Sequence, residues 1–157
     1  MKHISNESIE KAVAYINELS TEDFDNYAEQ VCSEQSCLVG YAMSSALEFE
    51  NENLMNLLMY YFHVYYNSFQ QEQIELKTID DEFIDAFQED FFSILDEFQK
   101  ENDVSILTTF SNQSNLISFL ISEMNYELEN DLDSETADQL FLVSTGVISI
   151  LSKAACK

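Results

Sequence analysis

The residues best placed to do chemistry are five carboxylates that recur at helical spacing, Asp81, Glu82, Asp85, Glu89 and Asp96. At 100° per residue they fall within a sector of roughly 100° on one side of a helix. Carboxylates four positions apart on a helix lie about 6 Å apart along its axis. Such a row of fixed anions can imitate a phosphate backbone and occupy a basic groove. The alternative interpretation is an ordinary solvated helix face, although Lys100 is the only base in this segment.

Two aromatic residues and one histidine join the row as candidate partner-binding residues. Phe92 projects near the acidic sector, about 120° from the centre of the apolar face of its helix. Tyr60 and His63 lie on a polar line along segment 52–73, which is otherwise apolar nearly all round. We expect this line to be the one part of that helix that touches water. Exposed aromatic side chains are favoured anchors at protein interfaces.

Nucleophilic catalysis is poorly supported. The chain has two histidines, His3 and His63, and three cysteines, Cys32, Cys37 and Cys156. A nucleophile–base pair between His63 and Cys32 or Cys37 is one interpretation, and structural cysteines with a surface histidine are the simpler one. Two glycines cannot build a nucleophile elbow or a phosphate-binding loop. We therefore expect no catalytic residues and no enzymatic activity.

Metal and cofactor sites are not expected either. A di-iron bundle needs Glu three residues before His, and Tyr60 occupies that position ahead of His63. The acidic stretch starting at Asp131 resembles the start of a calcium loop. It has Thr136 where that loop needs glycine and Leu142 where it needs glutamate.

The charge balance narrows the class of partner. Thirty acidic residues face six lysines and no arginine, which gives a net charge of −24. Direct binding to nucleic acid or to an anionic membrane needs clustered cations, so both are excluded, whereas a basic protein is attracted. No apolar run spans a membrane and no signal peptide is recognisable. With an odd, small number of cysteines, these features favour a cytoplasmic location.

The elements that position these residues are predicted to be helices. The chain has no proline and two glycines, and twelve phenylalanines and eight tyrosines supply its core. We expect an all-α fold, a compact array or bundle of seven to eight short-to-medium antiparallel helices in a single domain, 1–157, with residues 1–5 and 154–157 frayed. The helical segments are 6–19, one beginning at Thr21, 37–49, 52–73, 79–100, 103–129 with a break near 111–115, and 135–153.

Small residues predict one close helix contact. Segments 37–49 and 135–153 carry Gly40 and Gly146 among serine, alanine and threonine. A glycine costs a helix about 1 kcal/mol relative to alanine, so we expect these two helices to pack tightly in return. A resemblance between 37–47 and 141–151 also hints at a two-fold internal repeat.

Three hypotheses for function follow. The first is a non-catalytic acidic module that binds a basic protein, as an inhibitor, an immunity-like protein or a mimic of nucleic acid. The alternative is a structural or scaffold module, a homodimer formed by the apolar segments 52–73 and 135–153, whose acidity only confers solubility. The second alternative is a helical small-molecule binder or enzyme with a pocket near Tyr61, His63 and Tyr65.

Overall fold

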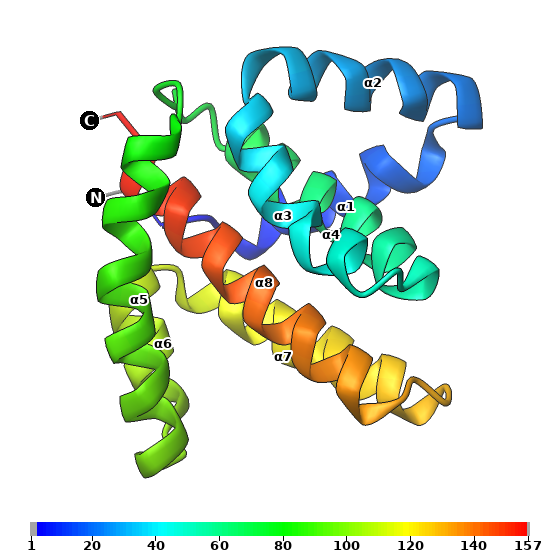
Figure 1. Ribbon diagram of the computed structural model, residues 1–157. Helices are drawn as coiled ribbons and strands as arrows, with labels where there is room; N and C mark the ends of the chain where they lie inside the picture. Colours follow the sequence, from blue (N-terminus) through cyan, green and yellow to red (C-terminus); the bar gives the residue numbers. More distant parts are fainter. Residues whose placement is uncertain (1–2, 157) are drawn as a thin grey trace.

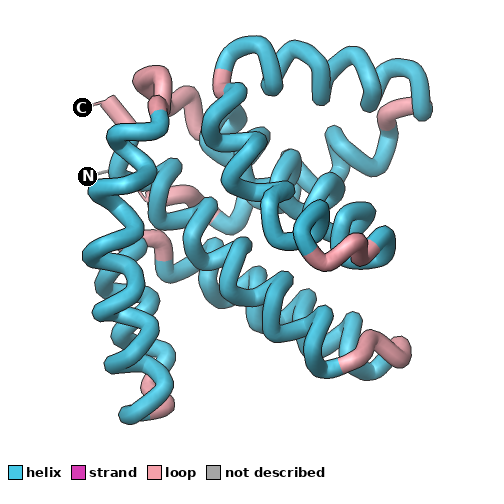
Figure 2. The backbone as a smooth tube through the Cα atoms, viewed as in Figure 1, coloured by secondary structure: helices cyan, strands magenta, loops and turns pink. Residues whose placement is uncertain are grey.

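The computed structural model describes residues 3–156, and this part of the chain is helical almost throughout (Figures 1 and 2). The all-α prediction is confirmed. Eight helices form a compact array within these residues, and an isolated antiparallel bridge joins Leu76 to Ala155. The helices are α1 (Asn6–Glu18), α2 (Thr21–Glu34), α3 (Ser36–Glu48), α4 (Glu52–Gln71), α5 (Asp81–Glu101), α6 (Val104–Ser111), α7 (Ser114–Glu129) and α8 (Ser134–Ala154).

Helix boundaries follow local capping chemistry. α5 begins two residues later than predicted because the side chain of Asp80 accepts a hydrogen bond from Phe83 N, at 2.8 Å. Ile79 is left just ahead of the cap and is buried. The predicted break in 103–129 is confirmed. Asn112, with φ of 57°, ends α6 in the left-handed conformation.

The central helices are α4 and α8, which pack against each other. Every residue from 61 to 69 on α4 and from 144 to 152 on α8 is buried. These two stretches are therefore used inside the fold, whereas Phe141 and Leu142 near the middle of α8 remain partly exposed.

In chain order the helices form two runs of four, α1–α4 and α5–α8, each of which ends with one of the two central helices (Figure 1). The buried positions of the two opening helices correspond at a constant spacing in the sequence, with Ile9, Ala12 and Ile16 matching Ile84, Phe87 and Phe91. The predicted repeat had a different register. It paired 37–47 with 141–151, which lie on α3 and α8, whereas the order of helices pairs α3 with α7 and α4 with α8.

Two buried glutamines join the halves reciprocally. Gln35 lies between α2 and α3, and its Oε1 accepts a hydrogen bond from Ile79 N, just ahead of α5, at 2.9 Å. Gln113 lies between α6 and α7, and its Oε1 accepts one from Ile4 N, just ahead of α1, at 2.8 Å. The two glutamines also share their backbone conformation, with φ of −138° and −135°. Each half thus fixes the start of the other, as equivalent patches do in a two-fold assembly.

The predicted small-residue contact is confirmed at one glycine and wrong at the other. α3 packs against α8. A Cβ placed on Gly146 would clash with the hydroxyl oxygen of Tyr41 on α3. A Cβ on Gly40 would meet nothing within 4 Å, because Gly40 faces solvent.

The described parts of both chain ends are packed, which corrects the expectation of fraying. Ile4 and Ala154 are fully buried, and Cys156 N donates to Glu75 O at 2.8 Å. Residues 1, 2 and 157 lie outside the described part of the chain. None of the helices within residues 3–156 has the length and apolar character that crossing a lipid bilayer requires.

Candidate functional site

The acidic row lies on the outer face of α5. The opposite face of this helix anchors it to the core through Ile84, Phe87 and Phe91. Phe87 and Phe91 stack on each other with ring centroids 5.0 Å apart, and both contact the ring of Phe110 on α6. This anchoring fixes which side of α5 faces outward. All five predicted carboxylates are exposed there: Asp81, Glu82, Asp85, Glu89 and Asp96.

Phe92 lies within the acidic row rather than beside it. Glu89 precedes it by three residues and Asp96 follows it by four, so both lie one turn away on the same face. The side chain of Phe92 is 60% exposed, among the most exposed large apolar side chains in residues 3–156. α5 therefore presents an aromatic side chain surrounded by carboxylates.

Within residues 3–156, no lysine pairs with the row at contact distance. α5 carries eight acidic residues and one lysine, Lys100. Between residues that the structure describes, the ion pair within 4.0 Å is Glu7–Lys11 on α1, with N–O distance 3.1 Å. Among the described residues, the carboxylates of α5 repel one another with no cation at contact distance, and the nearby Lys153 is attracted to Asp90, outside the row. The carboxylates of the row are free to pair with cations of another molecule.

Tyr60 does not join this surface. It is half-buried on α4, where its ring meets that of Tyr61 edge to face at 5.0 Å. Burial, offset in part by the side chain of Asn17, raises the pKa of its phenol, as do the nearby carboxylates of Glu123 and Glu127. Its neighbours belong to α1 and α7, so its predicted role as an anchor beside Phe92 is not supported by its position.

His63 is buried, and the prediction that it lies at the surface is wrong. Only 1% of the residue is exposed, because side chains of α2 cover this part of the polar line of α4. Phe24 and Tyr27 of α2 meet its ring at 5.2 and 5.7 Å. Nδ1 lies 2.6 Å from Met59 O, so Nδ1 carries the proton and donates to this carbonyl. Desolvation lowers the pKa of His63, which keeps the ring neutral.

His63 and Thr145 occupy the same position in the two central helices, twelve residues after the N-caps Asn51 and Asp133. Thr145 on α8 also bonds the carbonyl four residues before it, Phe141 O, at 2.8 Å. His63 and Thr145 both fall within the buried run of their central helix. This shared bond indicates a structural role for His63 within α4.

The two nucleophile–base pairs considered for His63 are not formed. Cys32 and His63 line the same surface pocket of about 360 Å³, together with Asp25, Val39 and Met59. Within residues 3–156, no group lies within hydrogen-bonding distance of His63 Nε2, so no hydrogen bond joins it to Cys32. Partial burial and the Asp81 carboxylate raise the pKa of Cys37, which makes its thiol a weaker nucleophile at neutral pH.

The tyrosines of the small-molecule hypothesis face away from that pocket. Tyr61 donates to Glu127 Oε1 at 3.0 Å, and Tyr65 packs edge to face on Phe119, with centroids 6.5 Å apart. Both partners are on α7, whereas His63 faces α2. Tyr61, His63 and Tyr65 therefore do not line one common pocket.

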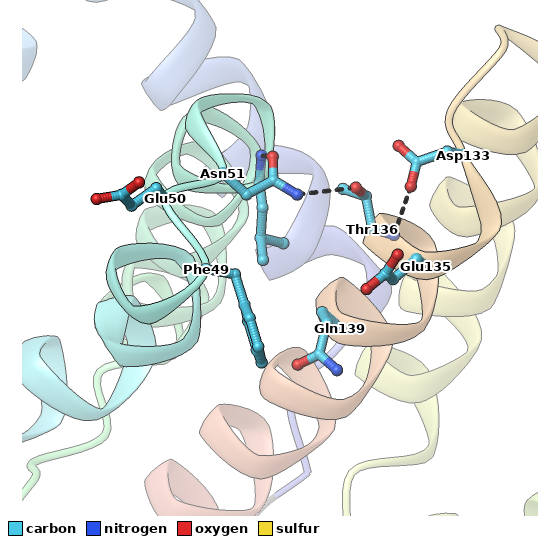
Figure 3. Close-up of a pocket in the computed structure, with 8 residues that line it drawn as sticks. Phe49, Glu50, Asn51, Asp133, Glu135, Thr136 and Gln139 are labelled. Carbon is cyan, nitrogen blue, oxygen red and sulfur yellow. Dashed lines mark hydrogen bonds between the residues drawn. The ribbon is translucent and has the colours of Figure 1, made fainter.

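A polar pocket of about 410 Å³ lies where the N-termini of α4 and α8 meet (Figure 3). Asn51, the N-cap of α4, donates to Thr136 Oγ1 at 3.0 Å, and Thr136 N donates to Asp133, the N-cap of α8, at 2.9 Å. Hydrogen bonds from the backbone and the side chain of Thr136 lower the pKa of Asp133. Figure 3 shows Glu50 directed away from Asp133 and Glu135, so the carboxylates do not converge. The geometry is that of a joint between two capped helices.

A carboxyl that sequence reasoning missed is Glu123 on α7. Burial and the neighbouring Glu127 raise its pKa, and it lies beside the tyrosines of α4. No spacing in the sequence marks it, because the contact is between segments far apart in the chain. Within residues 3–156, no three histidine, cysteine or acidic side chains are grouped so that they could hold a metal ion.

The structure therefore brings together six of the eight predicted partner-binding residues, the five carboxylates and Phe92, on one exposed helix face. It separates Tyr60 and His63 from them. No known protein family, curated protein or solved structure matches this chain.

Proposed function

We propose that this protein binds a basic protein through the outer face of α5 and has no catalytic role. The observation that carries the proposal is Phe92, 60% exposed within a row of carboxylates that no described cation neutralises. By covering a basic surface, the protein acts as an inhibitor, an immunity-like protein or a mimic of nucleic acid. Its three cysteines are free, which is consistent with a reducing, cytoplasmic setting.

The carboxylates and the aromatic ring contribute differently to binding. The charges raise the rate of encounter with a cationic partner, and this effect declines as salt screens them. Burial of Phe92 against the partner contributes about 2 kcal/mol and slows dissociation. Affinity therefore depends on salt mainly through the association rate.

The test is reversal of three charges in the row, Asp85→Lys, Glu89→Lys and Asp96→Lys. These side chains are exposed, so the variant keeps its helical circular-dichroism spectrum. Immobilised wild-type protein is expected to retain basic proteins from a lysate of the source organism and release them as NaCl rises. The reversed variant is expected to lose these same proteins.

A matched control separates the α5 face from net charge. Glu10→Lys, Glu18→Lys and Glu48→Lys change the net charge equally, at exposed positions of α1 and α3. This control is expected to retain the proteins that the α5 variant loses. Equal retention by both variants, or equal loss, would show that binding does not depend on the α5 face.

A further inference from the structure

The two halves differ most in their first helix. α5 has 21 residues, whereas its counterpart α1 has 13, and the extra turns lie beyond the last anchoring residue, Phe91. α1 packs closely along α4, but α5 approaches α8 over a shorter stretch. Figure 1 shows α5 and α8 running at an angle to each other. The terminal turns of α5 are therefore not needed to complete the repeated core.

A groove of about 400 Å³ lies between these extra turns and α8. Its apolar lining comes from Leu95 and Phe98 on one side and from Phe141 and Leu142 on the other. The rings of Phe98 and Phe141 stack with centroids 6.0 Å apart. All four side chains remain partly exposed, so the groove is an apolar surface that the fold leaves partly uncovered.

Carboxylates lie along both sides of the groove. Asp138 lines it on the α8 side and is exposed. On the α5 side Gln99 lines it, and Asp96 of the acidic row is exposed one turn before Gln99. The groove has two helical walls, so it offers no strand edge to pair with an extended peptide. A helix brings its backbone hydrogen bonds already satisfied and needs only side-chain contacts.

We infer that this groove receives a basic amphipathic helix of the partner, an inference that rests on the proposed function. Apolar side chains of that helix, spaced at three and four residues, pack over Phe98 and Phe141. Its lysines and arginines lie over Asp96 and the row on one side and over Asp138 on the other. The carboxylates at the sides of the groove favour a positively charged helix, and its apolar lining favours a helix with one apolar face.

The probe is a labelled peptide of about 18 residues, or five helical turns, with leucines on one face and lysines elsewhere. Its control is a scrambled peptide of the same composition. Wild-type protein is expected to bind the amphipathic peptide about tenfold more tightly by fluorescence anisotropy. Leu142→Gln is expected to remove the difference in affinity between the amphipathic and the scrambled peptide. Ile106→Gln, in the pocket of about 390 Å³ between α5 and α6, is expected to keep the difference.

A second measurement uses the unaltered protein and so does not depend on how a variant folds. A paramagnetic label at the centre of the amphipathic peptide is expected to broaden amide signals of 95–99 and 138–142 more than those of 104–110. Equal affinity of wild-type protein for both peptides, or broadening centred on 104–110, overturns the groove. The α5 row is judged separately: unchanged affinity of the triple-lysine variant for both peptides overturns the proposed function itself.

Discussion

At the residue scale, the two glycines differ in what a substitution by alanine would do to stability, because one is exposed and the other is packed. Gly40 faces solvent within α3, so Gly40→Ala is expected to stabilise the protein by about 0.5–1 kcal/mol through helix propensity. Gly146→Ala places a Cβ against Tyr41 and Phe91 and is expected to destabilise by about 1–2 kcal/mol. Urea denaturation of both variants measures the two signs.

A double variant isolates the cause at Gly146. Tyr41→Phe removes the hydroxyl oxygen that the new Cβ would approach most closely. Gly146→Ala is expected to cost less in that background than in the wild type. Equal cost in both backgrounds would place the strain elsewhere in the contact between α3 and α8.

Residue patterns predicted the exposure of a side chain well where no second helix packs over it. They predicted it poorly where a second helix covers the side chain. The carboxylates of α5 and Phe92 are exposed as their angular positions indicated. His63 lies on a polar line that looked solvated in isolation, but α2 covers it. Helical periodicity describes a side chain's direction on its own helix and contains no information about which other helix packs there.

At the scale of elements, Gln35 and Gln113, which lie between helices, connect the two halves of the chain by hydrogen bonds. Gln35 accepts from Ile79 N and donates to Lys77 O, at 2.9 and 3.0 Å, across more than forty residues of sequence. Gln35→Ala is expected to lower the free energy of unfolding by about 1–3 kcal/mol, because the buried Ile79 amide loses its partner. Urea unfolding monitored by circular dichroism provides the measurement.

Two variants calibrate that loss. Gln30→Ala, on the exposed side of α2, is expected to change stability by less than about 0.5 kcal/mol. Gln35→Glu keeps an acceptor for Ile79 N and is expected to cost less than alanine if that bond dominates. A loss no larger for Gln35→Ala than for Gln30→Ala would mean that the bridge between the halves is energetically unimportant.

The helices themselves were predictable, and the relation between them was not. Capping residues, hydrophobic periodicity and the scarcity of glycine located all eight segments within a few residues. The predicted pairing of 37–47 with 141–151 rested on shared small residues, whereas these segments lie on α3 and α8, which contact each other and hold different places in the order of helices. The true correspondence is carried by Gln35 and Gln113, whose distant hydrogen-bond partners no local pattern reveals.

For the whole molecule, the net charge of −24 is carried on 8591 Å² of surface. Like charges repel more strongly in the compact folded state than in the expanded unfolded chain. Raising NaCl toward about 0.1 M, where screening extends over roughly 10 Å, is therefore expected to raise the urea midpoint of unfolding. Binding to a basic partner should weaken over the same range.

NaCl is expected to raise the urea midpoint and to weaken binding to a basic partner. Because the two changes have opposite signs, they can be told apart in the same series of NaCl solutions. Urea is the suitable denaturant because it is uncharged and does not itself screen the surface. A midpoint that falls or stays constant with NaCl would show that self-repulsion is not a significant cost to folding.

The hydrogen bonds of Gln35 and Gln113 between the halves also have a consequence for the order of the halves along the chain. Gln113 bonds both Ile4 N and Ser152 Oγ, so the beginning of α1 and the end of α8 meet at one side chain, and Ala155 lies against Leu76 in the link between the halves. The fold therefore specifies which half contacts which, but not which half must come first. A circularly permuted chain, opened in the link at 74–78 and joined across its present ends, would present the same eight helices with α5 leading.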